Sequence, residues 1–229
     1  MTPQTAAPAR PAHAHRPPGL LTVPALAGLA YAVAWLAGLA VAPSSTSVRS
    51  TGTAVVAGYT GHEGAGALQF LLTQGIAALA LVAVATALGR AGVRAGAVRP
   101  ARLTLGAGVT AAAISLVQCA LGLYLIISVV PARHAGTAAA ITETVNRLDG
   151  AKMFLLAAMA AAGTVLARRT RLLPRWLQWT GLALAVAITV SGIGYALLNN
   201  TFALAAWVSL PLLLVWVTGA GIVLGRARH

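Results

Sequence analysis

The longest uncharged stretch of the chain does most to limit its fold. No Asp, Glu, Lys or Arg occurs in the fifty residues 176–225. A bilayer core of about 30 Å is crossed by roughly 20 apolar residues of α-helix, so this stretch is too long for one crossing and suits two. Backbone polar groups in lipid must be hydrogen-bonded within the segment, which favours helices. Because Asn199, Asn200 and Thr201 stand at the midpoint and paired asparagines favour turns, we expect a hairpin there.

Four further apolar runs precede this hairpin, and together they predict an all-α fold: a polytopic transmembrane helix bundle with six spans between residues 19 and 225. The expected spans are residues 19–42, 67–89, 103–130, 151–167, 176–198 and 202–225. The fourth is short, so we expect Lys152 at its start to extend its ammonium group outward to the membrane surface. Residues 1–18 are expected to form a disordered arm and residues 226–229 a short tail.

A cleaved signal peptide is the alternative for the first apolar run. The residues Ala40, Val41 and Ala42 fit the pattern of a cleavage site. The following Pro43 opposes cleavage, and the apolar run is longer than that of a usual signal peptide. We therefore expect this run to stay in the protein as a membrane span.

The composition excludes several other classes of protein. Hydrophobic residues make up 59% of the chain and charged residues only 8%, whereas a soluble domain is about 25% charged. The single cysteine, Cys119, excludes an internal disulfide framework and a Cys-rich metal site. A net charge of +13 is spread in short arginine clusters between apolar runs, which is typical of membrane proteins and not of nucleic-acid-binding proteins. The expected partners are the lipid bilayer, whose anionic headgroups the arginines can bind, and a membrane protein; no nucleic acid is expected.

The positive charges are divided unequally between the two sides of the predicted bundle. Of sixteen Arg and Lys residues, twelve lie in the two termini and in the second and fourth loops. The other side carries Arg49, Arg133, Arg147 and Lys152. Because cytoplasmic loops carry the excess of Arg and Lys, the sequence predicts a multi-pass protein of the cell membrane with both termini in the cytoplasm.

No motif indicates catalysis or a bound cofactor. The expected spans contain no histidine and no charged residue in their cores, and the zinc motif H-E-x-x-H and the nucleophile motif G-x-S-x-G are absent. Proton-coupled pumps and ion carriers commonly use charged residues inside the membrane. We therefore expect no metal, no haem and no other cofactor, and we assign no catalytic residue.

The polar residues that do occur gather toward the outer half of the bundle. Residues 137–148 are expected to be helical, and Asn146 and Asp149 would share one face, with Lys152 three residues beyond. Asp149 and Lys152 are either a surface ion pair at the start of the fourth span or, with Asn146, one wall of an outward-facing pocket. The candidate ligand-binding residues are Asn146, Asp149, Lys152, Gln69, Gln74 and Gln118. The alternative for the three glutamines is packing between helices.

Two segments resemble parts of known proteins. Residues 173–181 (LPRWLQWTG) resemble the L-P-x-W-L-x-W-x-G element that precedes the fifth span in uncharacterised six-span membrane proteins of GC-rich bacteria. Residues 146–153 (NRLDGAKM) are similar to a segment of the same proteins, which are grouped as domains of unknown function. The resemblance implies a six-span bacterial membrane protein and implies no activity.

Three functions are compatible with these observations. The absence of buried charge and of catalytic motifs favours a scaffold, a sensor or an accessory subunit. The outer polar residues indicate a small-molecule carrier or receptor with an outward-facing pocket. The third hypothesis is a membrane enzyme that acts on a lipid or prenyl substrate with Glu63 or Asp149 as general acid, but a general acid needs a pKa raised by burial.

Overall fold

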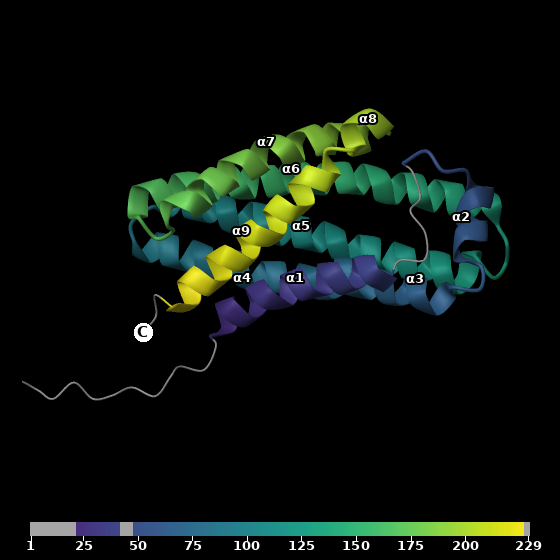
Figure 1. Cartoon of the computed structure of the whole chain (residues 1–229), viewed down its shortest axis with the longest axis horizontal. Coiled ribbons are helices and arrows are strands. Elements are labelled where there is room, and N and C mark those ends of the chain that lie inside the picture. Colours follow the sequence, from purple (N-terminus) through teal and green to yellow (C-terminus); the bar gives the residue numbers. More distant parts are fainter. Residues whose placement is uncertain (1–21, 42–47, 227–229) are drawn as a thin grey trace, which may run out of the picture.

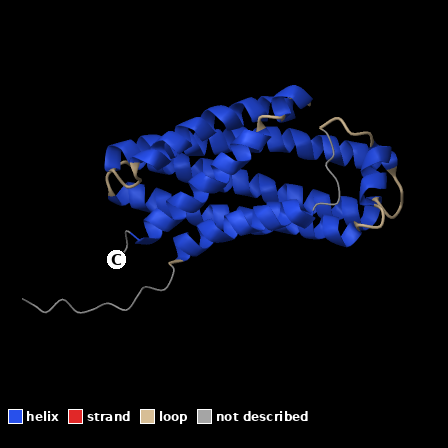
Figure 2. Cartoon of the chain, viewed as in Figure 1, coloured by secondary structure: helices blue, strands red, loops and turns tan. Residues whose placement is uncertain are grey.

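The computed structural model describes residues 22–41 and 48–226, and every regular element in this part is a helix (Figure 2). The predicted arm at 1–18 and residues 227–229 of the predicted tail lie outside the described residues. Six helices are long and apolar enough to cross a membrane, which confirms the all-α class and the expected number of membrane-length helices. These helices are Val23–Val41, Glu63–Arg94, Val98–Val129, Ala135–Thr170, Arg175–Ala196 and Asn200–Arg226.

Several of the six helices are divided into shorter elements. The first is α1 (Val23–Val41), and the second comprises α3 (Glu63–Phe70), η1 (Leu71–Ile76) and α4 (Ala77–Arg94). The third comprises α5 (Val98–Tyr124) and η2 (Leu125–Val129), and the next two are α6 (Ala135–Thr170) and α7 (Arg175–Ala196). The last comprises α8 (Asn200–Ala203) and α9 (Ala206–Arg226), and a short helix α2 (Gly52–Tyr59) lies outside the six. Both η1 and η2 are π-helical.

The six helices run along the long axis of the molecule, and α9 crosses the bundle obliquely (Figure 1). The helix α6 packs between α5 and α7, and α1 packs against α9 and α4. Small residues permit the closest approaches: a Cβ atom on Gly221 of α9 would collide with the carbonyl oxygen of Pro24 in α1. The fully buried indole of Trp216 packs against Gly163 of α6 and Gly181 of α7.

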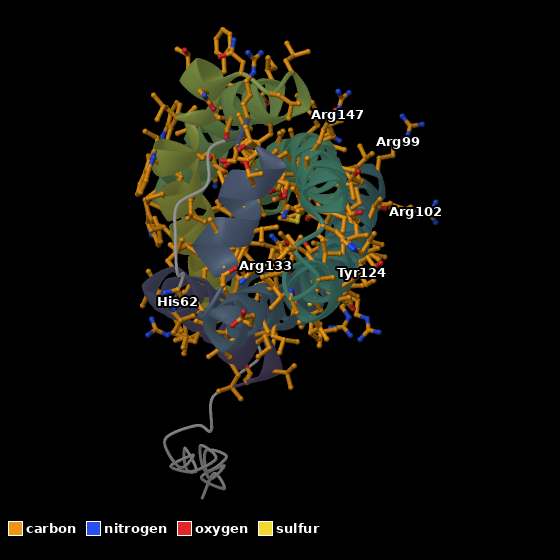
Figure 3. All side chains as sticks on the ribbon, turned by 90° about the vertical axis from the view of Figure 1, so that its right-hand side faces the viewer. His62, Arg99, Arg102, Tyr124, Arg133 and Arg147 are labelled. Atoms are coloured by element: carbon orange, nitrogen blue, oxygen red, sulfur yellow. The ribbon has the colours of Figure 1, made fainter. Side chains whose placement is uncertain are left out.

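One end of the bundle carries most of the arginines, and we call it the arginine-rich end. It contains Arg90, Arg94, Arg99, Arg102, Arg168, Arg169, Arg171, Arg175 and Arg226. The opposite end carries α2, and we call it the α2 end. Figure 3 looks onto the α2 end, and in it Arg99, Arg102 and Arg147 extend away from the bundle. Charged side chains thus lie at both ends of the bundle.

The helix α6 begins earlier than the expected fourth span. It has 36 residues, which corresponds to a length of about 54 Å, and it joins the helix expected at 137–148 to the span in one rod. At the α2 end, Val55 and Tyr59 of α2 pack with Ile126 and Ile141 in a second, smaller core. The sequence did not predict α2, because a short apolar helix of eight residues is stabilised by such packing rather than by its own propensity.

Candidate functional site

The buried side chain of Lys152 is the centre of a polar network between three helices. Its Nζ donates to Oε1 of Gln74 in η1 at 3.0 Å and to Oε1 of Gln118 in α5 at 2.9 Å. Its third partner is Oδ1 of Asp149, one turn earlier on α6, at 2.5 Å. An ammonium group has three N–H donors, so all of them are engaged.

The burial of Lys152 shows that one expectation from the sequence was wrong. The side chain is only 6% exposed, so it does not extend to the membrane surface. Lys152 lies in the middle of the continuous helix α6, and its face of the helix packs against the rest of the bundle. Because a charged group inside a bilayer costs roughly 2.5–3.5 kcal/mol or more, the three oxygen partners are needed to offset that cost.

Gln118 connects the network to the backbone of α6. Its side chain is 0% exposed, and its Nε2 donates to the carbonyl oxygen of Val145 at 2.9 Å. The amide therefore accepts from Lys152 at one end and donates to α6 at the other. This arrangement holds α5 against α6 and fixes the position of the oxygen that faces the ammonium group.

A π-helical turn places Gln74 in the same network. The segment η1 covers Leu71–Ile76, and both Thr73 and Gln74 are buried in it. The hydroxyl of Thr73 donates to the carbonyl oxygen of Gln69 at 2.8 Å. Single π-turns inside α-helices are rare and occur frequently at functional sites, so η1 is a second feature that marks this region.

The network borders a cavity of about 450 Å³. All six long helices contribute to its wall, and most of the wall is apolar. Among the described residues that line the cavity, only Asp149 and Lys152 are charged. Four aromatic residues also line the cavity: Tyr31, Trp35, Tyr195 and Trp207. Tyr31 and Trp35 are one helical turn apart on α1.

The remaining sequence-predicted residues lie outside this network. Asn146 donates from Nδ2 to the carbonyl oxygen of Val48 at 3.2 Å. Val48 lines the cavity, but Asn146 does not. Gln69 does not line the cavity, and its buried Oε1 has no hydrogen-bond partner among the described residues. Glu63 lies at the start of α3, where its carboxylate accepts from the backbone N–H of Gly61 at 3.0 Å. The structure therefore brings together four of the six candidate ligand-binding residues: Asp149, Lys152, Gln74 and Gln118. The other two, Asn146 and Gln69, lie outside the network.

The sequence contains a signal for this network that composition does not show. Each of Gln74, Gln118 and Lys152 lies sixteen residues from an arginine at the arginine-rich end of its own helix. These arginines are Arg90, Arg102 and Arg168. Sixteen residues of helix span about 24 Å, so equal spacing places the three side chains at one depth of an antiparallel bundle. The aromatic residues of the cavity were missed because no comparable spacing links them across helices.

Comparison with known proteins adds no relative: no family model, no curated protein and no solved structure matches the chain. The resemblance of residues 173–181 and 146–153 to bacterial six-span proteins stays a prediction. Within residues 22–41 and 48–226, no three His, Cys, Asp or Glu side chains gather in one place that could hold a metal ion. The geometry of the cavity itself is therefore the basis for an assignment of function.

Proposed function

We propose that this chain is a small-molecule receptor or carrier of the cell membrane, and that its ligand occupies the cavity beside Lys152 and Asp149. The observation that carries the proposal is the cavity of about 450 Å³, which all six long helices line and which has one buried ion pair in its wall. Ligand sites are typically cavities of about 300–1,000 Å³ with apolar walls and a few polar groups. The cavity agrees with that description in both size and chemistry.

The buried ion pair supports binding rather than packing alone. Replacement of a buried pair by apolar residues is often neutral or stabilising, so stability gives little reason to keep one. Charged residues inside a membrane mostly face the bundle interior or a cavity and mark ligand or ion pathways. Lys152 and Asp149 both line the cavity, which places charge where a ligand would be.

The proposal includes an orientation in the membrane. The arginine-rich end of the described bundle corresponds to the side with twelve positive charges, so it would face the cytoplasm, together with both termini. The polar network lies about 24 Å from the arginines of that end. In a bilayer core of about 30 Å, that depth corresponds to the outer leaflet, so the cavity would be reached from the outer half.

A filled-cavity variant tests the proposed site with an uncharged probe, the fluorophore 1-aminoanthracene, whose emission rises in apolar sites. Ala206 lines the cavity and its neighbour Ala205 does not, and both are half-buried. We expect saturable binding of the probe to the full chain in uncharged detergent, loss of that binding in Ala206→Trp, and retention of it in Ala205→Trp. If Ala206→Trp retains the probe as well as Ala205→Trp does, the probe does not occupy this cavity and the proposed site is refuted.

The other two hypotheses have less support from the geometry. A scaffold or accessory role stays a prediction that rests on the absence of catalytic motifs, and it does not require a cavity. The enzyme hypothesis relied on Glu63 or Asp149 as general acid. Glu63 does not line the cavity, and the carboxylate of Asp149 is engaged in an ion pair with Lys152.

A further inference from the structure

We infer that the ligand of this cavity is a lipophilic organic cation, an inference that rests on the proposed binding function and narrows it to one chemical class. The first argument is the hydrogen-bonding state of Lys152. Gln74, Gln118 and Asp149 engage its three N–H donors. An anionic ligand would have to displace one of these partners, so the ammonium group is not available as an anion site.

The carboxylate of Asp149, in contrast, has capacity to spare. Its side chain is 18% exposed against 6% for Lys152, and its Oδ1 accepts from the ammonium group. A carboxylate presents about four lone-pair positions, and one contact to Lys152 leaves most of them open. The negative member of the pair is thus the one that offers unused hydrogen-bonding capacity in the cavity wall.

The aromatic residues in the cavity wall also favour a positively charged ligand. Trp35, Tyr31, Tyr195 and Trp207 line the cavity together with Asp149. The faces of Trp and Tyr rings attract cations, most strongly where water is excluded, and aromatic groups of this kind recognise quaternary ammonium ligands. A carboxylate with several aromatic rings is therefore a set of groups suited to an organic cation that carries apolar substituents.

The position of the cavity indicates that the ligand is lipophilic. Near the arginine-rich end, α1 and α9 are in contact, and the hydroxyl of Thr218 donates to the carbonyl oxygen of Gly28 at 2.8 Å. Toward the α2 end the two helices separate (Figure 1). There Leu39 of α1 and Trp207 of α9 line the cavity while they are 48% and 79% exposed.

The cavity therefore opens sideways between α1 and α9, on the apolar flank of the bundle. In a membrane that flank faces lipid. A ligand that enters by this route has to dissolve in the bilayer, which excludes small hydrophilic cations and favours a cation with a large apolar surface.

Two ions of the same shape and opposite charge test the inference: tetraphenylphosphonium and tetraphenylborate. Each competes with 1-aminoanthracene for the full chain in uncharged detergent, with protein-free micelles as background. We expect tetraphenylphosphonium to displace the fluorophore and tetraphenylborate not to displace it. Displacement by tetraphenylborate alone would overturn the cationic class and leave the binding cavity intact, whereas absence of any saturable fluorophore signal would overturn the proposed function itself.

Variants locate the charge selectivity. The double variant Asp149→Asn with Lys152→Met keeps the network neutral, and we expect it to bind tetraphenylphosphonium about thirtyfold more weakly or worse while it still binds the uncharged fluorophore. Trp207→Ala should weaken tetraphenylphosphonium about twofold to fivefold. Trp179 is 64% exposed and does not line the cavity, so Trp179→Ala is the matched control and should have no effect. Unchanged tetraphenylphosphonium affinity in the double variant would refute the role of Asp149.

Discussion

Replacement of Lys152 by methionine tests whether the buried network is as tightly coupled as its geometry indicates. The change removes three N–H donors and leaves the Asp149 carboxylate and two amide oxygens without their partner. Removal of one partner from a buried ion pair costs about 3–5 kcal/mol. Because Asp149 is 18% exposed and borders the cavity, we expect the lower limit of that range, about 3 kcal/mol.

The expected shift is large enough to measure by thermal unfolding in detergent. For a protein of this size, 1 kcal/mol corresponds to about 2–4 °C in Tm, so Lys152→Met should lower Tm by about 6–12 °C. Asp149→Asn retains an amide oxygen that can accept from Lys152, and we expect a loss of about 2 kcal/mol, since hydrogen bonds to charged groups contribute about 1.5–3 kcal/mol. The double variant should be more stable than Lys152→Met, because it leaves no unpaired charge.

A surface ion pair on the same helix is the control. Arg147 and Glu143 are 2.7 Å apart, and their side chains are 61% and 52% exposed. Such pairs contribute about 0.2–1 kcal/mol, so Arg147→Met should change Tm by at most about 4 °C. If Lys152→Met is no more destabilising than Arg147→Met, or if the losses at Lys152 and Asp149 simply add, the network is not coupled and the argument for a built site fails.

Three further outcomes are expected. Reporter fusions should place one set of positions in the cytoplasm and the other outside; the cytoplasmic positions are Gly96 and Thr170, and the outer ones are Gly136 and Asn200. A cytoplasmic signal at Asn200 would contradict the proposed topology. Gly221→Ala should lower Tm because the new Cβ meets the carbonyl oxygen of Pro24. Gly106→Ala, whose new Cβ meets nothing within 4 Å, should raise Tm, because Ala favours the helix over Gly by up to about 1 kcal/mol. A gain at both positions would refute the close packing of α1 on α9. The purified protein should show no haem absorption, since none of the six long helices contains a histidine. A Soret band would contradict this.

The sequence determined the class of fold and the number of long helices. Uncharged runs of about 20 residues have few alternatives, because backbone groups in lipid must be paired within the segment. The turn between the last two long helices follows from the same rule together with local chemistry. Asn199 caps α8 by accepting from the N–H groups of Thr201 and Phe202, and this local preference needs no tertiary contact.

The candidate site could be predicted only in part. The sequence placed Asp149 near Lys152 on one helix, and it indicated Gln74 and Gln118 as candidates without bringing them to the same depth. It also led to the expectation that Lys152 would point outward, since a charge near the end of a short span normally extends to water. That expectation failed because the span was not short: α6 continues past the membrane-length segment to Ala135.

Only the tertiary structure decided which polar groups meet. The side chain of Lys152 turns inward because Gln74 and Gln118 approach it from two other helices, and these contacts join residues 78 and 34 positions apart in the chain. The π-turn η1 and the separation of α1 from α9 likewise depend on how the helices pack. A sequence pattern records the periodicity and length of each helix, but the rotation of one helix against another is set by the packing of its side chains on its neighbours, and it is this rotation that forms the cavity.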